Sequence, residues 1–198
     1  MITLFRHSKT RSTRFIFLLE ELEAPYELKT VTIRNADGTG EIDPANPHPH
    51  GKVPAISDDG NIVFESPAIA LYLTDKFPKN RLGPLVGEAG RGEYLSWLCY
   101  YASVLEPAFM SKFMNIEVPR GTAAWVAVEE VIPAVIKRLN AGPYILGDRF
   151  SAADILYGTT FAMFGESPML PKSPVIEDYA KRVVSRPAYD RSRALDAG

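Results

Sequence analysis

The sequence has very little cysteine. Cys99 is the only cysteine among 198 residues, so the chain cannot form an internal disulfide or a metal site with several cysteine ligands. Disulfides are typical of oxidising compartments, and their exclusion favours a reducing environment. The sequence therefore predicts a cytoplasmic protein.

Long apolar runs and an excess of one charge are also missing. The apolar segments FIFLL and AIALYL are far shorter than the ~18 to 20 residues of a membrane-spanning helix. Met1 is followed at once by the strand-like ITLF, so we predict no signal peptide or membrane anchor. The formal net charge of -2 provides no basic field for nucleic acid. We expect neither a membrane nor a nucleic acid as a partner.

Hydrophobic periodicity divides the chain into two parts. Short apolar or alternating runs predict strands, and an apolar period near 3.6 residues predicts helices. The predicted strands are residues 2–5, 26–33, 53–57 and 61–64, and the first predicted helices are residues 12–23 and 66–77. The DDG sequence before the last of these strands is typical of a tight hairpin turn. The first part therefore contains a βαβ unit, a hairpin and a helix.

After a stretch rich in proline and glycine, every apolar segment has a helical period. The predicted helices of this second part are residues 93–114, 124–140, 151–165 and 175–186. Ser151 and Asp154 form the pattern of a capping box at the start of one of them. We therefore predict an α/β domain over residues 1–78, a linker over 79–88 and an all-helical domain over 89–198.

The tetrapeptide FESP indicates a binding site for an amino acid head group. Ser66 and Pro67 suit the N-cap and the first position of a helix, whose N-terminus attracts anions. The Ser66 hydroxyl can donate to a ligand carboxylate, and Glu65 can pair with a ligand ammonium group. The alternative is a plain capped helix with a surface glutamate.

The tripeptide KVP gives a second indication of ligand binding. Pro54 holds Val53 extended, and a cis bond between them would leave the backbone of Val53 free to pair with a ligand as an added strand. Lys52 can bind a second carboxylate. The alternative is an edge-strand proline beside a solvated lysine.

Together these segments resemble cytosolic glutathione transferases of the bacterial theta, beta and nu-like types. The stretch HPHGKVPAISDDGNIVFESPAIALYL is similar to the family segment that binds glutathione. LFRHSKTRSTRFIFLLEEL is similar to the first strand and helix of the family, YILGDRFSAADI to its capping-box segment, and VVSRPAY to its last helix. This resemblance implies a thioredoxin-like N-terminal domain, an all-helical C-terminal domain and glutathione as co-substrate. The implied glutathione-binding residues are His50, Lys52, Val53, Pro54, Glu65 and Ser66.

The resemblance places the thiol of glutathione beside HSKTRSTR, residues 7–14. A helix N-terminus, a nearby cation or a donated hydroxyl hydrogen bond lowers a thiol pKa from ~8.5 and so favours the nucleophilic thiolate. Many relatives have a serine at the position of Thr10, so Thr10 is one candidate catalytic residue. Ser12 is the second candidate and Ser8 the third. The alternative is that these hydroxyls only cap a helix.

We expect no metal and no thiol chemistry from the protein itself. His7, His48 and His50 lack the spacing of a zinc-binding pair. Residues 7–14 contain no cysteine, which argues against glutaredoxin-like chemistry.

The second part is rich in large apolar side chains at its start. The resemblance implies that some of them line a pocket for a hydrophobic electrophile. The candidates are Tyr94, Trp97, Tyr101 and Phe109. The alternative is that they belong to the core and to a dimer interface.

The resemblance thus implies a glutathione transferase that conjugates the glutathione thiolate to a hydrophobic electrophile, and a homodimer. One alternative is a non-catalytic relative that binds glutathione or another protein. Glutathione-dependent peroxidases, isomerases and dehalogenases are further alternatives with the same fold.

Overall fold

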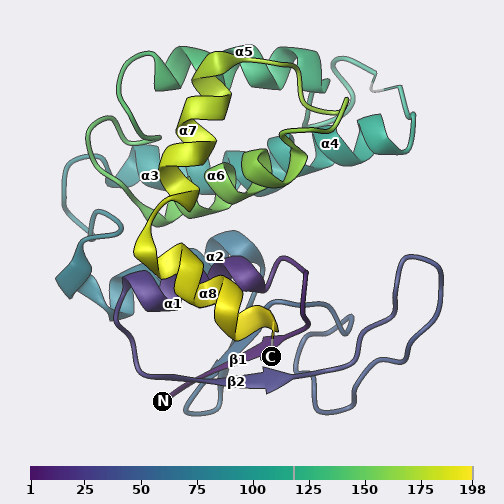
Figure 1. Ribbon diagram of the computed structural model, residues 1–198, viewed down its shortest axis with the longest axis vertical. Helices are drawn as coiled ribbons and strands as arrows, with labels where there is room; N and C mark the ends of the chain where they lie inside the picture. Colours follow the sequence, from purple (N-terminus) through teal and green to yellow (C-terminus); the bar gives the residue numbers. More distant parts are fainter. Residues whose placement is uncertain (118, 198) are drawn as a thin grey trace. The chain divides into compact units, whose positions relative to one another are not determined.

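The protein is described by a computed structural model over residues 1–117 and 119–197, and it divides into two compact units (Figure 1). Unit 1 consists of Met1–Asn80 and the chain from Arg186 onward, and unit 2 is Arg81–Ser185. The boundary after Asn80 falls inside the predicted linker 79–88. The structure differs from the predicted division at the other end, because the last helix belongs to unit 1 rather than to a domain over 89–198.

Unit 1 contains a four-stranded sheet in the order β2-β1-β3-β4. Its strands are β1 (Ile2–Arg6), β2 (Tyr26–Thr30), β3 (Ala55–Asp58) and β4 (Asn61–Phe64). β1 and β2 are parallel, whereas β3 is antiparallel to both of its neighbours. Asp59 and Gly60, which join β3 to β4, both have positive φ angles, as a tight two-residue hairpin turn requires. The predicted βαβ unit and hairpin are confirmed.

The helices of unit 1 are α1 (Thr13–Glu21), α2 (Ser66–Lys76), the short η1 (Pro78–Asn80) and α8 (Pro187–Ala197). α1 is apolar on several sides and buries the consecutive residues Phe15 to Leu19. A helix needs this composition when it is covered on more than one side. α8 runs alongside α1 (Figure 1), where the rings of Phe17 and Tyr189 meet edge to face at 5.5 Å.

Unit 2 is entirely helical apart from short bridges. Its elements are α3 (Arg91–Tyr100), η2 (Tyr101–Leu105), α4 (Glu106–Phe113), α5 (Val128–Leu139), α6 (Ala152–Phe164) and α7 (Pro174–Val184). The first three form one run in which η2 is a wider, π-helical turn. Pro107 follows this turn, and a proline ring cannot fit against the carbonyl four residues earlier in a regular α-helix. The expected helix over 93–114 is therefore present but interrupted.

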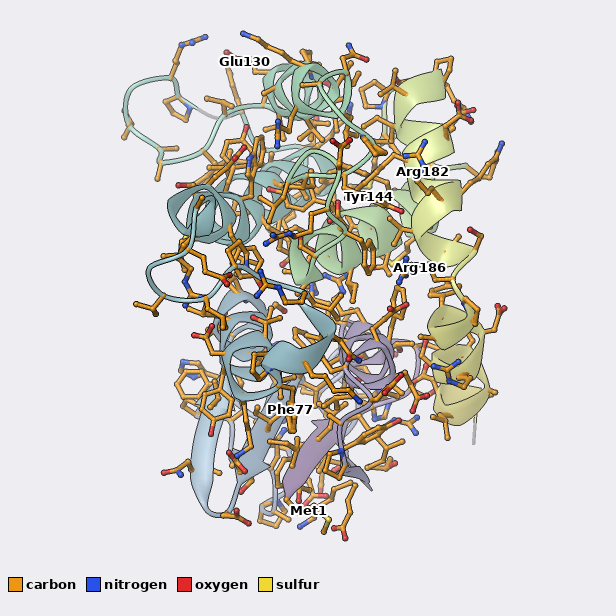
Figure 2. The ribbon with its side chains drawn as sticks, turned by 90° about the vertical axis from the view of Figure 1, so that its left-hand side faces the viewer. Met1, Phe77, Glu130, Tyr144, Arg182 and Arg186 are labelled. Carbon is orange, nitrogen blue, oxygen red and sulfur yellow. The ribbon has the colours of Figure 1, made fainter. Side chains whose placement is uncertain are left out.

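The core of unit 2 is built around α6. The capping box of Ser151 and Asp154 is present, and the Ser151 N–H donates to Asp154 Oδ2 at 2.8 Å. Gly158 allows α6 to approach α7 closely, because a Cβ atom there would lie 2.6 Å from the Cβ of Val183. Near the start of α6, the guanidinium of Arg182 lies 5.9 Å from the ring centre of Tyr144 (Figure 2). None of the helices described for residues 1–117 and 119–197 is both long enough and apolar enough to cross a membrane.

Candidate active site

The strand register brings the candidate binding segments to one end of the sheet in unit 1. Phe5 of β1 pairs with Ala55 of β3, and Ala55 in turn pairs with Phe64 of β4. Neighbouring strands lie ~5 Å apart, so these three positions form one short row across the sheet. The chain leaves this row into residues 7–12 after β1 and into Glu65 after β4, and it enters the row from Pro54. Segments far apart in the sequence therefore meet at this end.

Three oxygen atoms form a hydrogen-bonded triangle in the turn after β1. Thr10 Oγ1 donates to the His7 carbonyl at 2.6 Å, and Ser12 Oγ donates to the same carbonyl at 2.9 Å. The two hydroxyl oxygens lie 2.8 Å apart, and either can donate to the other. Two hydroxyl protons thus serve three contacts. One of the protons can turn toward a ligand without leaving both hydroxyls unpaired.

The surroundings distinguish the three candidate hydroxyls. Ser12 is completely buried, and its Oγ also accepts the His7 N–H at 3.2 Å. It makes no side-chain cap for α1, so the capping alternative does not describe its hydroxyl. The Ser8 hydroxyl donates at 2.7 Å to the carbonyl of Asp196, at the end of α8. Thr10 is half-buried, so of the two side chains in the triangle it is the one with exposed surface.

The segment before β3 has the backbone geometry expected from KVP. The Val53–Pro54 peptide bond is cis. Val53 is half-buried and precedes the first paired residue of β3, and no hydrogen bond of its backbone is present within the described part of the chain. Lys52 is exposed, and its carbonyl accepts a hydrogen bond of 3.1 Å from the Asn46 side chain. The side chain of Lys52 is thus solvated, whereas its backbone is fixed by the hydrogen bond from Asn46.

Glu65 and Ser66 begin α2 one residue earlier than predicted. Ser66 is the first helical residue and Glu65 is the N-cap, so the prediction of Ser66 as N-cap is wrong. Glu65 has a φ of 69°, which costs a residue with a Cβ about 1 to 2 kcal/mol. Its carbonyl accepts the Ile69 N–H at 2.9 Å. Such backbone conformations occur often at functional sites, where the surrounding structure holds them.

His48 contacts Phe64 and lies near Glu65 at this end of the sheet. Its ring is buried against Phe64, and its Nε2 lies 3.9 Å from the Glu65 carboxylate. His48 Nδ1 accepts the His50 N–H at 3.0 Å, which assigns the proton of the neutral ring to Nε2. Burial lowers the pKa of His48, although the nearby Glu65 opposes this shift. His50 itself is exposed. His48 was not among the predicted site residues, although it lies only three residues before Gly51, the first residue of the GKVP segment.

The aromatic candidates of the second substrate site lie mostly in the core of unit 2. Tyr94 and Tyr101 have no exposed surface, and Phe109 is buried and stacks on Phe164 at 5.0 Å. The Tyr101 hydroxyl donates to Glu106 at 2.7 Å. These three side chains pack within the unit, in agreement with the core alternative and not with an open pocket. Trp97 is half-buried and packs against Tyr157.

Other apolar side chains of unit 2 are exposed instead. One group lies just after Phe109, on α4 and in the chain that follows it, and one residue lies just before Phe164 on α6. The stacked rings of Phe109 and Phe164 bring these two segments together. The exposed residues are Met110, Phe113, Met114, Ile116 and Met163. Phe113 is 71% exposed and Met163 is 64% exposed, which is unusual for side chains of this size. Methionines adapt to ligands of varied shape.

The structure also shows groups that sequence patterns did not indicate. α8 was not predicted as a separate helix, although Pro187 at its first position and Asp190 in its first turn are typical helix-start residues. Asp196 near the end of α8 contacts the turn after β1, and no local pattern could reveal this long-range contact. Within residues 1–117 and 119–197 no three histidine, cysteine or acidic side chains gather as metal ligands would.

Comparisons with known proteins agree on one family. Residues 1–75 match the model of the glutathione S-transferase N-terminal domain. The glutathione S-transferase GstB of Escherichia coli is 28% identical over 95% of both chains. A glutathione transferase from Methylococcus capsulatus superposes with a TM-score of 0.78 at 27% identity, covering 100% of this chain and 99% of the other. A sphingomonad glutathione S-transferase in complex with glutathione gives a TM-score of 0.77 at 26% identity over 98% of both chains.

These matches cover both units. The four-stranded sheet of unit 1 and the helical unit 2 form the architecture that the resemblance implied. Unit 1 has the thioredoxin-like fold, and unit 2 is the helical C-terminal domain. Residues 1–75 thus match the N-terminal domain of the glutathione S-transferase family, and the whole chain is similar in sequence and fold to bacterial glutathione S-transferases.

Proposed function

We propose that the protein is a glutathione transferase that joins the sulfur of glutathione to an electrophilic, mostly apolar substrate. The observation that carries this proposal is the row of Phe5, Ala55 and Phe64, which gathers the hydroxyl triangle, the Val53 backbone and the Glu65–Ser66 pair at one end of the sheet. The sphingomonad relative was solved with glutathione bound, which supports glutathione as the ligand of the same fold.

The groups at this end suit the parts of glutathione. Glu65 is exposed and carries a negative charge for the ammonium group of the γ-glutamyl residue, while the Ser66 hydroxyl has no partner within the described residues and can donate to its carboxylate. The unpaired backbone of Val53 can bind the backbone of the cysteinyl residue as an added strand. Lys52 and His50 are exposed and can interact with the glycyl carboxylate.

In this proposal Thr10 donates a hydrogen bond to the sulfur and thereby favours the thiolate. Its proton then leaves the His7 carbonyl, and the buried Ser12 hydroxyl keeps its own bond to that carbonyl or donates to Thr10. Ser12 therefore acts as a positioning residue. The start of α1 and the exposed Lys9 add positive potential.

The chemical step is a substitution or an addition at the electrophile. The thiolate forms a bond from sulfur to the electrophilic carbon. In a substitution this carbon releases its leaving group with the bonding electron pair, and in an addition the π bond breaks and the neighbouring atom, which receives its electron pair, takes up a proton from water. Proximity and the stabilised thiolate provide the catalysis. The exposed apolar side chains on and after α4 and on α6, among which Phe113 and Met163 are the most open, would bind the apolar part of the electrophile.

The proposal is tested by three measurements on the same preparation. Titration calorimetry with glutathione measures binding, and absorbance of the bound thiolate against pH measures its pKa. An assay with a reactive aryl halide then measures conjugation. We expect binding, a thiol pKa below ~8.5 and turnover. Binding without turnover would instead identify a non-catalytic glutathione-binding protein, and absence of binding would overturn the proposal.

A further inference from the structure

The carboxylate of Asp196, near the end of α8, is buried against the turn that carries Thr10. Asp196 is 3% exposed. Its Oδ2 accepts the Thr13 hydroxyl at 2.8 Å and the Lys9 N–H at 3.0 Å, and the Ser8 hydroxyl lies 3.5 Å away. One oxygen of a distant helix thus contacts residues on both sides of Thr10.

The negative charge of Asp196 is balanced by Arg6. This arginine is the last residue of β1, is 4% exposed, and places Nη2 3.3 Å from Asp196 Oδ1. Arg6 also donates to the last carbonyls of α8, through Nη2 to Asp196 at 3.0 Å and through Nη1 to Leu195 at 3.4 Å. A cation at this helix end pairs favourably with the exposed carbonyls. The end of β1 therefore fixes the end of α8.

The backbone at Lys9 explains why the turn needs such a contact. Lys9 has a φ of 57°, in the left-handed region that residues with a Cβ rarely occupy. This conformation turns the chain between Ser8 and Thr10 and so sets the direction of the Thr10 hydroxyl. The Lys9 N–H is held by Asp196 Oδ2, and no other acceptor for it is present in the described structure.

We propose that Asp196 is a positioning residue for catalysis, which fixes the Lys9 turn so that the Thr10 hydroxyl faces the sulfur of glutathione. This inference rests on the proposed function and adds to it a part of the site that comes from the other end of the chain. Asp196 touches the turn and not the substrate. It acts through the geometry of Lys9 and Thr13.

Geometry and charge make opposite predictions for the loss of this carboxylate. If Asp196 acted only through its charge, its removal would leave the Arg6 cation unbalanced and would lower the thiol pKa. If it acts by positioning, its removal frees the turn, weakens the Thr10 hydrogen bond and raises the thiol pKa. The sign of the change therefore separates the two roles.

The test uses Asp196→Ala and the more conservative Asp196→Asn, with Asp190→Asn on the exposed side of α8 as the matched control. We expect the thiolate titration of bound glutathione to move upward by ~1 pH unit in Asp196→Ala, as loss of a hydrogen bond to a charged group implies, and by less in Asp196→Asn. Turnover at neutral pH should fall about tenfold, whereas KM for glutathione should change less than about twofold. Asp190→Asn should behave as wild type.

Amide hydrogen exchange of the ligand-free protein tests the contact itself. Exchange at Lys9 should become at least about tenfold faster in Asp196→Ala, or in Asp196→Asn if only that variant folds, and remain unchanged in Asp190→Asn. Two results would overturn this inference alone. One is a thiol pKa that is lowered in the wild type but does not rise in either Asp196 variant, and the other is unchanged amide exchange at Lys9. A wild-type protein without a lowered thiol pKa overturns the proposed function, and the role of Asp196 in catalysis with it.

Discussion

Arg186 binds Glu21 through two parallel hydrogen bonds of 2.7 Å, from Nε to Oε1 and from Nη2 to Oε2. The pair joins the chain just before α8 to the end of α1, and the Glu21 side chain is only 10% exposed. A bidentate pair of an arginine and a carboxylate is stronger than a single surface contact.

We predict that Glu21→Gln lowers the free energy of unfolding by ~1 to 2 kcal/mol. The single contact of Arg191 with Glu20 provides the control, and Arg191→Gln should cost ~0.5 kcal/mol. Urea unfolding measures both, and equal losses would contradict the special role of the bidentate pair.

Thr10→Val keeps the branched shape of the side chain and removes its hydroxyl. In this variant the pKa of bound glutathione should rise by ~1 unit while the affinity changes little, because one donor to the thiolate is lost. Ser12→Ala should instead destabilise the fold by about 1 kcal/mol, since it leaves the half-buried His7 N–H without its acceptor. Thiolate absorbance and thermal unfolding distinguish the two effects. A larger pKa change in Ser12→Ala than in Thr10→Val would reverse the assigned roles.

Glu65→Ala and Ser66→Ala should each weaken glutathione binding by ~1 to 3 kcal/mol, because each removes a partner of a charged ligand group. Neither change should greatly alter stability, since the Ser66 hydroxyl is unpaired within the described residues and Glu65 is exposed. Calorimetry measures the affinity, and Glu41→Ala in the exposed loop before β3 serves as the control. Unchanged affinity in both site variants would show that the ligand binds elsewhere.

Asp154 makes the stability of the protein depend on pH. Burial raises the pKa of Asp154 to about 6, although hydrogen bonds from Ile145, Tyr179 and Ser151 oppose the shift. Because the folded protein holds this proton more tightly than the unfolded chain, the stabilising contribution is complete below ~4 and is lost as the pH rises through about 6. The advantage of wild type over Asp154→Asn in urea unfolding should therefore shrink between these values and stay constant at higher pH. An advantage that grows with pH would contradict this direction.

A homodimer is expected from the family and from the frequency of two-fold assemblies. Ile62 and Phe64 of the edge strand β4 are both exposed and, being two residues apart, lie on one face of the strand. Sedimentation should show a species of twice the 21.9 kDa chain mass at micromolar concentration. Ile62→Lys should weaken the dimer if this face takes part, and a purely monomeric wild type would rule the dimer out.

Local patterns were sufficient for the sheet and for the helix starts that depend on neighbouring residues. The alternation of β1 to β4, the DDG turn and the Ser151–Asp154 box are set by contacts within a few residues. The KVP and FESP segments could be predicted to lie close together, because they flank the two strands of one hairpin.

Tertiary packing determined what the sequence could not show. The aromatic rings of Tyr94 and Tyr101 have the same spacing whether they face a pocket or a core, and only the packing around α6 buries them. Glu65 precedes α2 with a positive φ that no propensity predicts for glutamate. The contact of Asp196 with Lys9 spans 187 residues, so no motif contains both groups.

The assignment of α8 to unit 1 has a consequence for synthesis of the protein. During translation the sheet of this unit emerges before unit 2, but the helix that covers α1 is made only after the whole of unit 2. Contacts between the two ends close a very long loop, which is entropically costly and slow to form. We therefore expect nascent unit 1 to expose the apolar side of α1 until α8 has emerged from the ribosome, so that it depends on chaperones at a stage when unit 2 can already fold.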